Sequence, residues 1–527
     1  MSVDFDSIVV GSGFGGSVLA CRLAEKNDRV LVLERGRRWQ PEDMPRERGD
    51  AWIYDPRKPE RKNGWIDLCL FDDMGVVQGA AVGGGSLIYA NVSVRAPENA
   101  FLTGWPAEIT YAELQPFYDT VGEMLELEEL PDNQLTRRFE KMQEGAAALG
   151  VPERFGKVEL AVKFDRDWHY GLDDPHNLER SKPVENAQGR MQGTCVHCGD
   201  CDLGCKVGAK STLDLNYLAR AEKLGAEVRP LHLVTAIEPL QTAGYRIHFD
   251  RIDPGRKERI ADSATTHRVF LAAGSLGSTE LLLRCRDQHG TLPNVSPRLG
   301  YGWSSNGDFL TPSFHRGEEI NPSAGPTITS IIDFNDGSRR GENFWIQDGG
   351  FPNALENYLE ERLEDPGTGR RERLVFEHLR QEVSDDQPLS CVMPWFAQGV
   401  DASDGRLYLG RDWFRPWQRK LRLDWRIKNS ESVMDAIVDT HKELARKTGG
   451  KPWVPPTWTL LKNLITPHPL GGCGMGDRAA NGVTDHRGEV FGHPGLFVVD
   501  GALFPRAIGR NPSRTIAALA ERVASLL

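Results

Sequence analysis

Near its amino end the chain reads Phe5-Asp6-Ser7-Ile8-Val9-Val10-Gly11-Ser12-Gly13-Phe14-Gly15-Gly16. The first six residues predict a short apolar strand of the kind buried in parallel sheets, and the glycine-rich remainder predicts a tight turn. Residues 17–26 then show helical periodicity, and residues 29–33 predict a second apolar strand that leads to Glu34. This order of strand, turn, helix, strand and acidic residue is typical of a dinucleotide-binding fold.

The glycines of this turn have separate mechanical roles in such a fold. Gly11 permits the tight turn, Gly13 lets the backbone approach a pyrophosphate, and Gly16 lets the helix pack close to the strand. The start of the helix offers unpaired N–H groups and a positive dipole end to the phosphates. Glu34 is placed to accept hydrogen bonds from an adenosine ribose and would repel a 2′-phosphate, so we expect FAD or NAD and not NADP. The cofactor-binding residues predicted in this unit are Gly11, Gly13, Phe14, Gly15, Gly16, Glu34 and Arg35.

Two later segments indicate which dinucleotide is bound. Three consecutive glycines, Gly83–Gly85, lie in the apolar stretch 78–91, where bare backbone N–H groups can reach a flat isoalloxazine ring. Residues 465–527 contain His468-Pro469-Leu470-Gly471-Gly472, then Gly509-Arg510-Asn511-Pro512, and a closing helix predicted from Thr515.

The order of these motifs resembles the glucose–methanol–choline (GMC) oxidoreductase family, and the chain is most similar to its cholesterol-oxidase-like branch. Residues 269–275 match the family's later strand and turn, and residues 302–308 match a phrase of that branch. The resemblance extends over nearly the whole chain. It implies FAD as the cofactor and an alcohol as the molecule that is oxidised.

The resemblance also implies roles for individual residues. His468 matches the family's catalytic histidine and Asn511 its partner, both above the re face of the flavin. Alcohol oxidation requires removal of the hydroxyl proton while hydride leaves the carbinol carbon for flavin N5. An imidazole, with an unperturbed pKa of about 6.5, can take that proton, and an asparagine amide can hold the same oxygen. The further cofactor contacts implied are Gly83, Gly84, Gly85, Ser86, Asn91, Val234, Ala273, Gly274, Asp500, Gly501 and Pro512.

Two departures from the branch bear on the reaction. Tyr89 stands where well-known cholesterol oxidases have an asparagine in the flavin loop, and Asn91 follows two residues later. Members that isomerise steroids use a glutamate on the substrate-domain sheet, and residues 388–395, which align approximately with that region, contain no carboxylate. We therefore expect oxidation without steroid isomerisation.

Four cysteines form an unusual motif, because Cys195, Cys198, Cys201 and Cys205 have the C-x2-C-x2-C-x3-C spacing of bacterial ferredoxins. Against an iron–sulfur cluster, Lys206 replaces the usual proline, and the fourth cysteine serves a second cluster in two-cluster ferredoxins. Zinc could be held by four thiolates, or by three with His197. A reduced loop without metal is the third alternative, and the sequence leaves all three open.

The chain is expected to form an α/β structure with two domains. A discontinuous FAD-binding domain of Rossmann type is predicted from residues 1–100, 190–300 and 456–527. A substrate domain of α+β type on a mainly antiparallel sheet is predicted from residues 101–189 and 301–455, with a helix at 111–127 and a strand at 421–425. Charged stretches broken by glycine at 333–342 and 360–373 predict surface loops or lids.

Aromatic residues are frequent in the second domain. As a group they indicate a large apolar pocket, although any single one is better explained as core. A bulky lipophilic alcohol, such as a sterol, a terpenoid or a long-chain alcohol, would suit that pocket better than a sugar. The residues are Trp303, Phe344, Trp345, Phe351, Trp395, Phe396, Trp413, Phe414, Trp417 and Trp425.

Composition excludes several other classes of function. The chain has 527 residues, with 75 Asp and Glu against 64 Lys and Arg, and the net charge of −11 argues against nucleic acid as a partner. No segment approaches the roughly 20 apolar residues of a membrane span, and the first residues lack the features of a signal peptide. Cytoplasmic residence is therefore expected.

Three functions are compatible with these motifs. The first is an FAD-dependent alcohol oxidase or dehydrogenase that passes electrons to oxygen or to another acceptor. The second is a lyase or decarboxylase that keeps FAD without net redox chemistry. The third is a flavoprotein for binding or electron relay that retains the fold without turnover.

Overall fold

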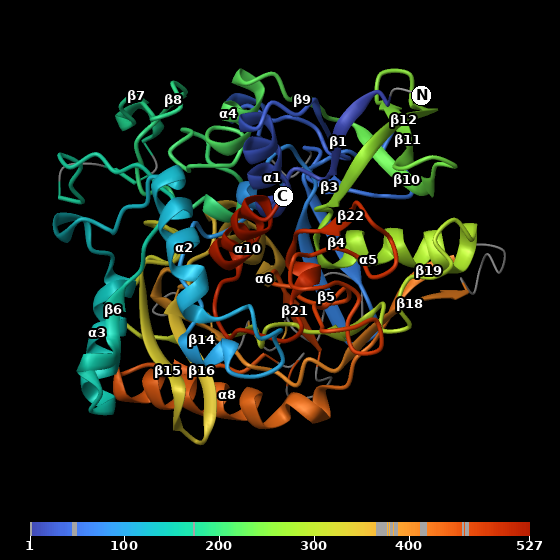
Figure 1. Cartoon of the computed structure of the whole chain (residues 1–527). Helices are drawn as coiled ribbons and strands as arrows, with labels where there is room; N and C mark the ends of the chain where they lie inside the picture. The colour runs from blue at the N-terminus through green and yellow to red at the C-terminus, as the bar shows by residue number, and fades with distance from the viewer. Residues whose placement is uncertain are drawn as a thin grey trace.

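Figure 1 shows the chain as a computed structural model, which describes residues 3–44, 50–171, 174–175, 177–364, 388–411, 419–455 and 463–527 and the single positions 377, 379, 383 and 458. Its largest sheet is assembled from three distant parts of the chain, in the order β10-β11-β12-β1-β2-β9 with β22 paired to β12. Pairing is parallel among β12, β1, β2, β9 and β22, and antiparallel among β10, β11 and β12. The strands are β1 (Phe5–Val10), β2 (Val30–Leu33), β9 (Glu227–Arg229), β10 (His232–Pro239), β11 (Tyr245–Asp253), β12 (Glu258–Leu271) and β22 (Leu496–Val498).

Helices cover this sheet because its central strands are apolar on both faces. All four residues of β2 are buried, as are the last four of β1. Helix α1 packs against α4 and α10, and α10 also packs against α2, so the first and the last helix of the chain lie side by side (Figure 1). This arrangement confirms the Rossmann-type α/β fold class. The helices are α1 (Phe14–Glu25), α2 (Tyr111–Leu125), α4 (Tyr217–Lys223), α5 (Gly274–Arg284) and α10 (Ser513–Ser525).

A second large sheet is antiparallel throughout and has the order β20-β14-β17-β16-β15-β6. Helices α3 (Arg137–Leu149) and α8 (Glu431–Lys447) pack against it, and Figure 1 shows α8 along its lower edge in orange. All its strands fall within the segments that were expected to form the substrate domain. They are β6 (Phe155–Lys157), β14 (Phe309–Phe314), β15 (Ser330–Arg339), β16 (Glu342–Asp348), β17 (Val392–Gly399) and β20 (Lys451–Pro452).

The described residues form three smaller sheets besides the two large ones. The sheet β21-β5-β4-β3 links the C-terminal segment to the N-terminal one, and β13-β18-β19 and β7-β8 form two more. Their bounds are β3 (Ile53–Tyr54), β4 (Ile66–Leu70), β5 (Met74–Gly79), β21 (Leu464–Thr466), β13 (Tyr301–Trp303), β18 (Gly405–Arg411), β19 (Arg419–Asp424), β7 (Val184–Glu185) and β8 (Met191–Gln192); helix α6 spans Asn353–Glu364.

The two predicted surface loops have different outcomes. Residues 333–342 were expected to be a loop, and that prediction is wrong, because β15 and β16 pair through them as a hairpin with Arg339 opposite Glu342. The glycines that suggested a break, Gly337 and Gly341, have positive φ and provide its irregular end. Of the second stretch, residues 360–364 belong to α6, and residues 365–373 lie outside the described residues.

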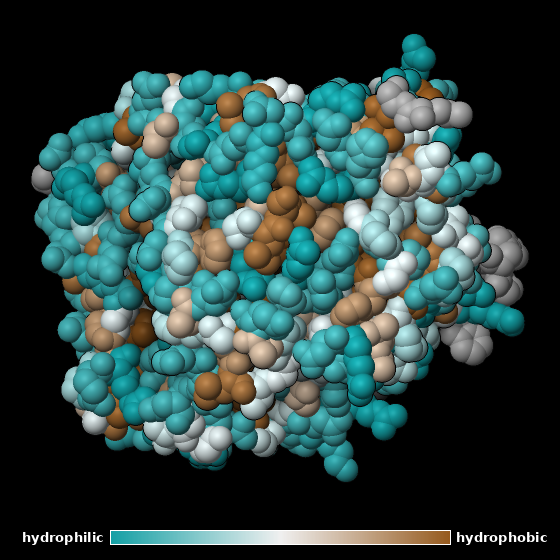
Figure 2. Space-filling model, in the orientation of Figure 1, coloured by the Kyte–Doolittle hydropathy of each residue, from teal (hydrophilic) through white to brown (hydrophobic). Residues whose placement is uncertain are grey.

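The surface in Figure 2 is mainly hydrophilic, with apolar side chains in scattered small groups. This agrees with the high proportion of charged residues in the chain. Among the described helices, none combines the length and the apolar character that crossing a membrane requires.

A buried arginine ties α3 to the second sheet. Arg138 is 0% exposed and pairs with the equally buried Asp348 at 3.1 Å. It also donates hydrogen bonds to the carbonyl oxygens of Ala324, Pro326, Thr327 and Gly349.

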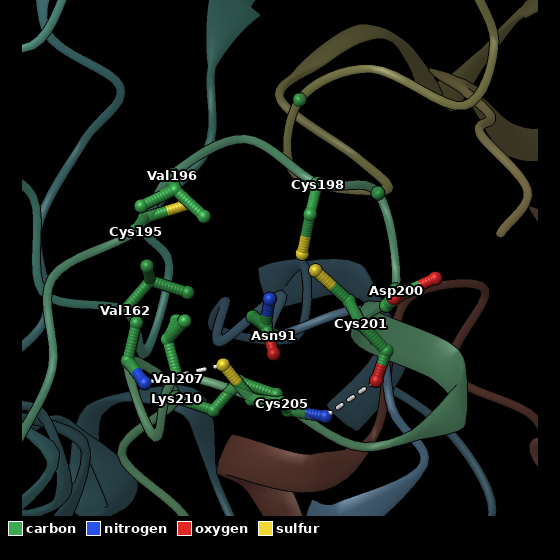
Figure 3. Close-up of a pocket in the computed structure, with 13 residues that line it drawn as sticks. Asn91, Val162, Cys195, Val196, Cys198, Asp200, Cys201, Cys205, Val207 and Lys210 are labelled. Atoms are coloured by element: carbon green, nitrogen blue, oxygen red, sulfur yellow. Dashed lines mark hydrogen bonds between the residues drawn. The ribbon is translucent and has the colours of Figure 1, made fainter. Parts of the chain in front are cut away.

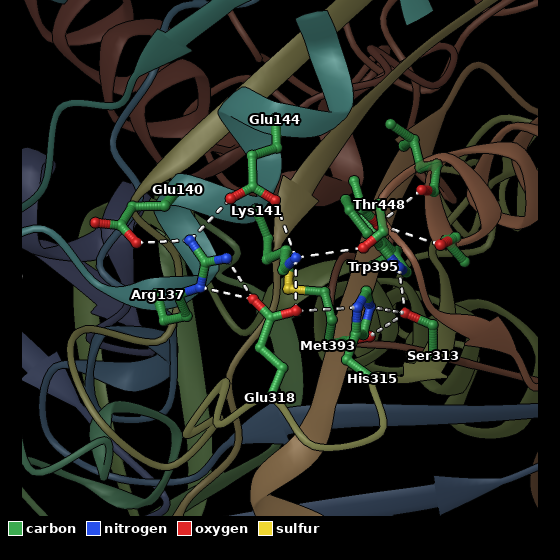
Figure 4. Close-up of polar contacts among 12 residues, drawn as sticks. Arg137, Glu140, Lys141, Glu144, Ser313, His315, Glu318, Met393, Trp395 and Thr448 are labelled. Carbon is green, nitrogen blue, oxygen red and sulfur yellow. Dashed lines mark hydrogen bonds and ion pairs between the residues drawn. The ribbon is translucent and has the colours of Figure 1, made fainter. Parts of the chain in front are cut away.

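We expect Arg138→Met to lower the free energy of unfolding by about 3–5 kcal/mol, because it leaves a buried carboxylate and several carbonyls without a donor. The neighbouring Arg137 is a matched control. It pairs with three glutamates at the surface (Figure 4) and has a 32% exposed side chain, so Arg137→Met should cost about 1 kcal/mol or less. Chemical denaturation of both variants checks this, and equal losses would contradict it.

Candidate active site

The turn between β1 and α1 leaves no room for side chains on three of its glycines. Gly11 has a left-handed backbone with a φ of +97°, and a Cβ there would lie 2.4 Å from the carbonyl oxygen of Ala272. A Cβ on Gly15 would lie 1.7 Å from the Val499 oxygen, and one on Gly16 would lie 2.1 Å from the Gly11 oxygen. The turn is therefore in contact with the chain just beyond β12 and β22, where parallel strands end.

Two other glycines border open space. A Cβ on Gly13 or on Gly85 would meet no protein atom within 4 Å. Between them, a Cβ on Gly84 would lie 2.7 Å from Gly13 Cα, and the Gly83 N–H donates to the Ser12 hydroxyl at 3.1 Å. The two glycine runs thus form one cradle of bare backbone, which fits the pyrophosphate and the flat ring of FAD.

Glu34 holds this cradle together. Its side chain is 5% exposed, and Oε2 accepts hydrogen bonds from the Ser12 N–H at 3.0 Å and the Ser12 hydroxyl at 2.7 Å. Oε1 accepts from the Gly36 N–H at 2.8 Å, and the adjacent Arg35 pairs with Asp67. Sequence reasoning assigned Glu34 to a ribose and did not predict these contacts, which shape the turn.

Replacing Gly13 with alanine should separate cofactor binding from folding. Its φ of −73° suits any residue, so we expect little change in the Tm of the apoprotein. The added methyl would enter the cradle, and FAD should bind about tenfold more weakly or worse, a loss of 1.4 kcal/mol for each factor of ten. Titration of apoprotein with FAD checks this. Gly15→Ala is the contrast, because its methyl strikes backbone and should impair folding itself; a Gly13→Ala protein that binds FAD like the parent would contradict the prediction.

A buried carboxylate connects two more of the predicted contacts. Asp500 accepts hydrogen bonds from the Gly274 N–H at 2.8 Å, the Ser278 hydroxyl at 2.5 Å and the Ala502 N–H at 2.8 Å. Burial raises the pKa of Asp500 to about 6, although these three donors oppose the rise. The start of α5 is thereby held beside the short helix η11 (Gly501–Leu503).

The remaining predicted contacts lie on elements around the cradle. Phe14 packs edge-on against Tyr89 with 5.5 Å between ring centroids, and the Ser86 hydroxyl donates to the Gly83 carbonyl. Strand β10 carries Val234 and begins at His232, whose N–H donates to the Glu34 carbonyl oxygen. Ala273 and Pro512 are the N-cap residues of α5 and α10.

His468 is oriented by a carboxylate that sequence reasoning did not single out. The His468 Nδ1 lies 2.8 Å from Oδ1 of Asp308, which is 1% exposed. The Thr466 hydroxyl donates to the other carboxylate oxygen at 2.5 Å and accepts from the His468 backbone N–H at 2.9 Å. Because an ionised carboxylate only accepts hydrogen bonds, Nδ1 carries the hydrogen and Nε2 keeps its lone pair.

Asn511 faces that lone pair. Its Nδ2 lies 3.4 Å from His468 Nε2, and its Oδ1 accepts a hydrogen bond from Gln347 Nε2 at 2.8 Å. Gln347 therefore fixes the amide so that its NH2 group points toward the imidazole. The pair predicted from two motifs 43 residues apart thus lies together, with Asp308 on one side and Gln347 on the other.

The aromatic residues of the second domain are mostly core. Trp303, Phe344, Trp345, Trp395 and Trp425 are at most 6% exposed. Phe396 is only partly buried, and its ring centroid lies 6.4 Å from that of His468, so it contributes an apolar surface at the site. Trp413, Phe414 and Trp417 lie outside the described residues.

The four cysteines of the motif line one cavity together with Asn91 (Figure 3). All four are free thiols, and the Asn91 amide is buried with no hydrogen-bond partner for either polar atom. In the described part of the chain, no group of three or more His, Cys, Asp or Glu side chains is placed to hold a single metal ion.

Comparisons with known proteins find relatives over nearly the whole chain. A family model described as GMC oxidoreductase matches residues 402–520, and one described as an NAD(P)-binding Rossmann-like domain matches residues 9–39. The chain is 31% identical to a cholesterol oxidase from Acinetobacter baumannii, over 99% of this chain and 94% of that protein. It is 23% identical to a long-chain-alcohol oxidase from Arabidopsis thaliana, over 99% of this chain and 67% of that protein.

A solved structure has the same fold. Pyridoxine 4-oxidase from Mesorbium loti superposes with a TM-score of 0.62 at 16% identity and covers 99% of this chain and 98% of that one. Full-length similarity above 30% identity, the glycine cradle and the C-terminal family match lead to one assignment. The chain belongs to the GMC oxidoreductase family, in its cholesterol-oxidase-like branch, and is an FAD-dependent alcohol oxidoreductase.

Proposed function

We propose that the chain oxidises a bulky lipophilic alcohol, such as a sterol, a terpenoid or a long-chain alcohol, without steroid isomerisation. The observation that carries the proposal is the orientation of His468, whose Nε2 lone pair faces the Asn511 amide. The 3.4 Å between these two nitrogens is long for a hydrogen bond, so both groups can contact one substrate oxygen.

Bound FAD supplies the hydride acceptor for this reaction. His468 Nε2 accepts the hydroxyl proton, and the Asp308 carboxylate stabilises the imidazolium that results. Asn511 Nδ2 donates a hydrogen bond to the same oxygen and keeps the carbinol carbon in position, while Gln347 prevents the amide from rotating. Phe396 gives the site an apolar wall.

The substrate class is supported by the relatives more than by the aromatic residues. The names of the two relatives above specify cholesterol and long-chain alcohols, both bulky and lipophilic. Most of the aromatic side chains that suggested a pocket are core, so they do not add to the argument.

The absence of isomerisation is supported by the group that the sheet presents to the site. Strand β16 presents Gln347, a neutral amide that cannot act as a base, and Phe396 lies opposite it on β17. Asp308 is engaged with His468, and the neighbouring Asp348 is paired with Arg138. Gln347, which contacts Asn511, lies outside the segment 388–395 that aligns approximately with the isomerising glutamate.

Anaerobic mixing of the holoenzyme with a sterol, a terpenoid and a long-chain alcohol tests the proposal. We expect at least one of them to bleach the flavin absorbance and to yield the carbonyl compound in equal amount. A sterol product should retain the position of its double bond, so no conjugated enone should form. Failure of every alcohol class to bleach the flavin would overturn the oxidation, and an enone would overturn the second part. Mixing the reduced enzyme with oxygen or a one-electron dye then identifies the class of acceptor.

A further inference from the structure

The cysteine loop is folded around a cavity, and the side chain of its one histidine, His197, contacts residues outside the loop. The His197 ring is buried and stacks on Trp168 with 4.0 Å between centroids. Its Nδ1 lies 2.8 Å from the Tyr170 hydroxyl, and its Nε2 lies 2.8 Å from Gln134 Oε1. Because both ring nitrogens are hydrogen-bonded, His197 cannot serve as a metal ligand. This excludes a zinc site made of three cysteines and one histidine.

Backbone N–H groups are directed at all four sulfurs. The His197 N–H donates to Cys195 Sγ at 3.4 Å, and the Ala209 N–H donates to Cys205 Sγ at 3.1 Å. Backbone hydrogen bonds from Asp200 and Thr327 reach Cys198 and Cys201, respectively. Such donors do little for a neutral thiol, whereas they stabilise a thiolate bound to metal.

A buried cation stands beside the cavity. Lys210 is 1% exposed, and its ammonium group donates to the carbonyl oxygens of Leu87, Tyr89 and Cys201. These bonds join the glycine loop of the cofactor cradle to the cysteine loop. A positive charge at this place compensates the negative charge that several thiolates would bring.

The arrangement of the sulfurs discriminates between the possible ligands. In Figure 3 the side chains of Cys198, Cys201 and Cys205 extend into the space around Asn91, and Cys195 lies at its edge. The thiols surround a cavity and do not converge on a point, in agreement with the lack of a single-ion site among the described residues. A polynuclear cluster, in which sulfide bridges several irons, binds thiolates that lie apart from one another, whereas one zinc ion needs all its sulfur ligands within about 2.3 Å of one point. All four cysteines come from one loop and line one cavity, so they can serve the same cluster.

We propose that Cys195, Cys198, Cys201 and Cys205 bind an iron–sulfur cluster beside the flavin loop. The cavity borders Asn91, two residues from Tyr89, and Lys210 links the carbonyl oxygens of Tyr89 and Cys201. The redox role of this site rests on the proposed function. Each alcohol oxidised releases two electrons and two protons; the electrons leave one at a time through the cluster to a one-electron acceptor such as a redox protein, and the protons go to solvent.

Iron and acid-labile sulfide analysis of anaerobically purified holoenzyme tests the binding. We expect several irons and sulfides per chain and an electron paramagnetic resonance signal that appears or changes with dithionite. Cys198→Ser and Cys201→Ser should lose the iron. Cys391→Ala is the matched control, because it removes a buried free thiol outside the loop and should keep the iron. Trace iron in the parent after reconstitution with iron and sulfide, one zinc per chain, or disulfides within the loop would each overturn the proposal.

The redox role has a separate readout. Alcohol added anaerobically should produce the same resonance signal as dithionite in the parent protein. Bleaching of the flavin without that signal would overturn electron transfer to the cluster. The metal analysis requires no alcohol and flavin bleaching requires no iron, so failure of this inference and failure of the proposed function can be told apart.

Discussion

Replacing His468 with alanine is expected to slow flavin reduction by the alcohol about 10²- to 10⁴-fold, the usual contribution of a positioned general base. The physical reason is the single lone pair at Nε2, which Asp308 and Asn511 hold in place. Once it is removed, the hydroxyl proton must pass to water in a site whose neighbouring residues are buried. Anaerobic stopped-flow absorbance at saturating alcohol measures the limiting rate directly.

The FAD content of this variant should equal that of the parent, because His468 forms its hydrogen bonds with Thr466, Asp308 and Asn511 and not with the glycine cradle. His289→Ala is the matched control, since it removes an exposed histidine on another element and should leave the rate unchanged. A His468→Ala protein that reduces its flavin as fast as the parent would remove the proposed base.

The sequence predicted those parts of the fold that depend on residues close together in the chain. The strand Phe5–Val10 has the bounds expected, and the following turn needs glycine at 11, 15 and 16 because other backbone lies within 2.4 Å of each Cβ position. Because only glycine fits at these three positions, the turn can be recognised in the sequence. The hairpin at residues 333–342 was missed because its glycines form the irregular end of a strand pair, which resembles a loop in sequence.

The candidate site shows where sequence reasoning ends. His468 and Asn511 were found through neighbouring motifs, but Gln347 carries no local signal, because its contact with Asn511 joins residues 164 positions apart in the chain. Asp308 lay in a segment recognised by resemblance, yet its role depends on a contact 160 residues along the chain. Likewise, the spacing of the cysteines left zinc open, and the folded loop narrows the choice by occupying both nitrogens of His197.

Replacing Asp308 with asparagine is expected to lower the limiting rate of flavin reduction about 100-fold. A carboxylate can only accept a hydrogen bond, so it keeps the hydrogen of His468 on Nδ1 and the lone pair on Nε2. An amide has nearly the same shape but can present its NH2 group to Nδ1, and that moves the lone pair to the wrong nitrogen. It also removes the negative charge that stabilises the imidazolium. The affinity for the alcohol should change little, because Asp308 lies behind the histidine.

A merely structural role for Asp308 would give a different result. The carboxylate is buried and also accepts the Thr466 hydroxyl, so part of any effect could come from lost packing. Thr466→Val removes that second bond and the acceptor of the His468 backbone N–H but leaves the charge beside the imidazole, and we expect it to slow flavin reduction less than Asp308→Asn does. Asp308→Glu restores the charge at a changed distance and should recover part of the rate. If Asp308→Asn lowers Tm but reduces its flavin at the parental rate, or if Thr466→Val matches its loss, Asp308 holds the fold and does not orient the base.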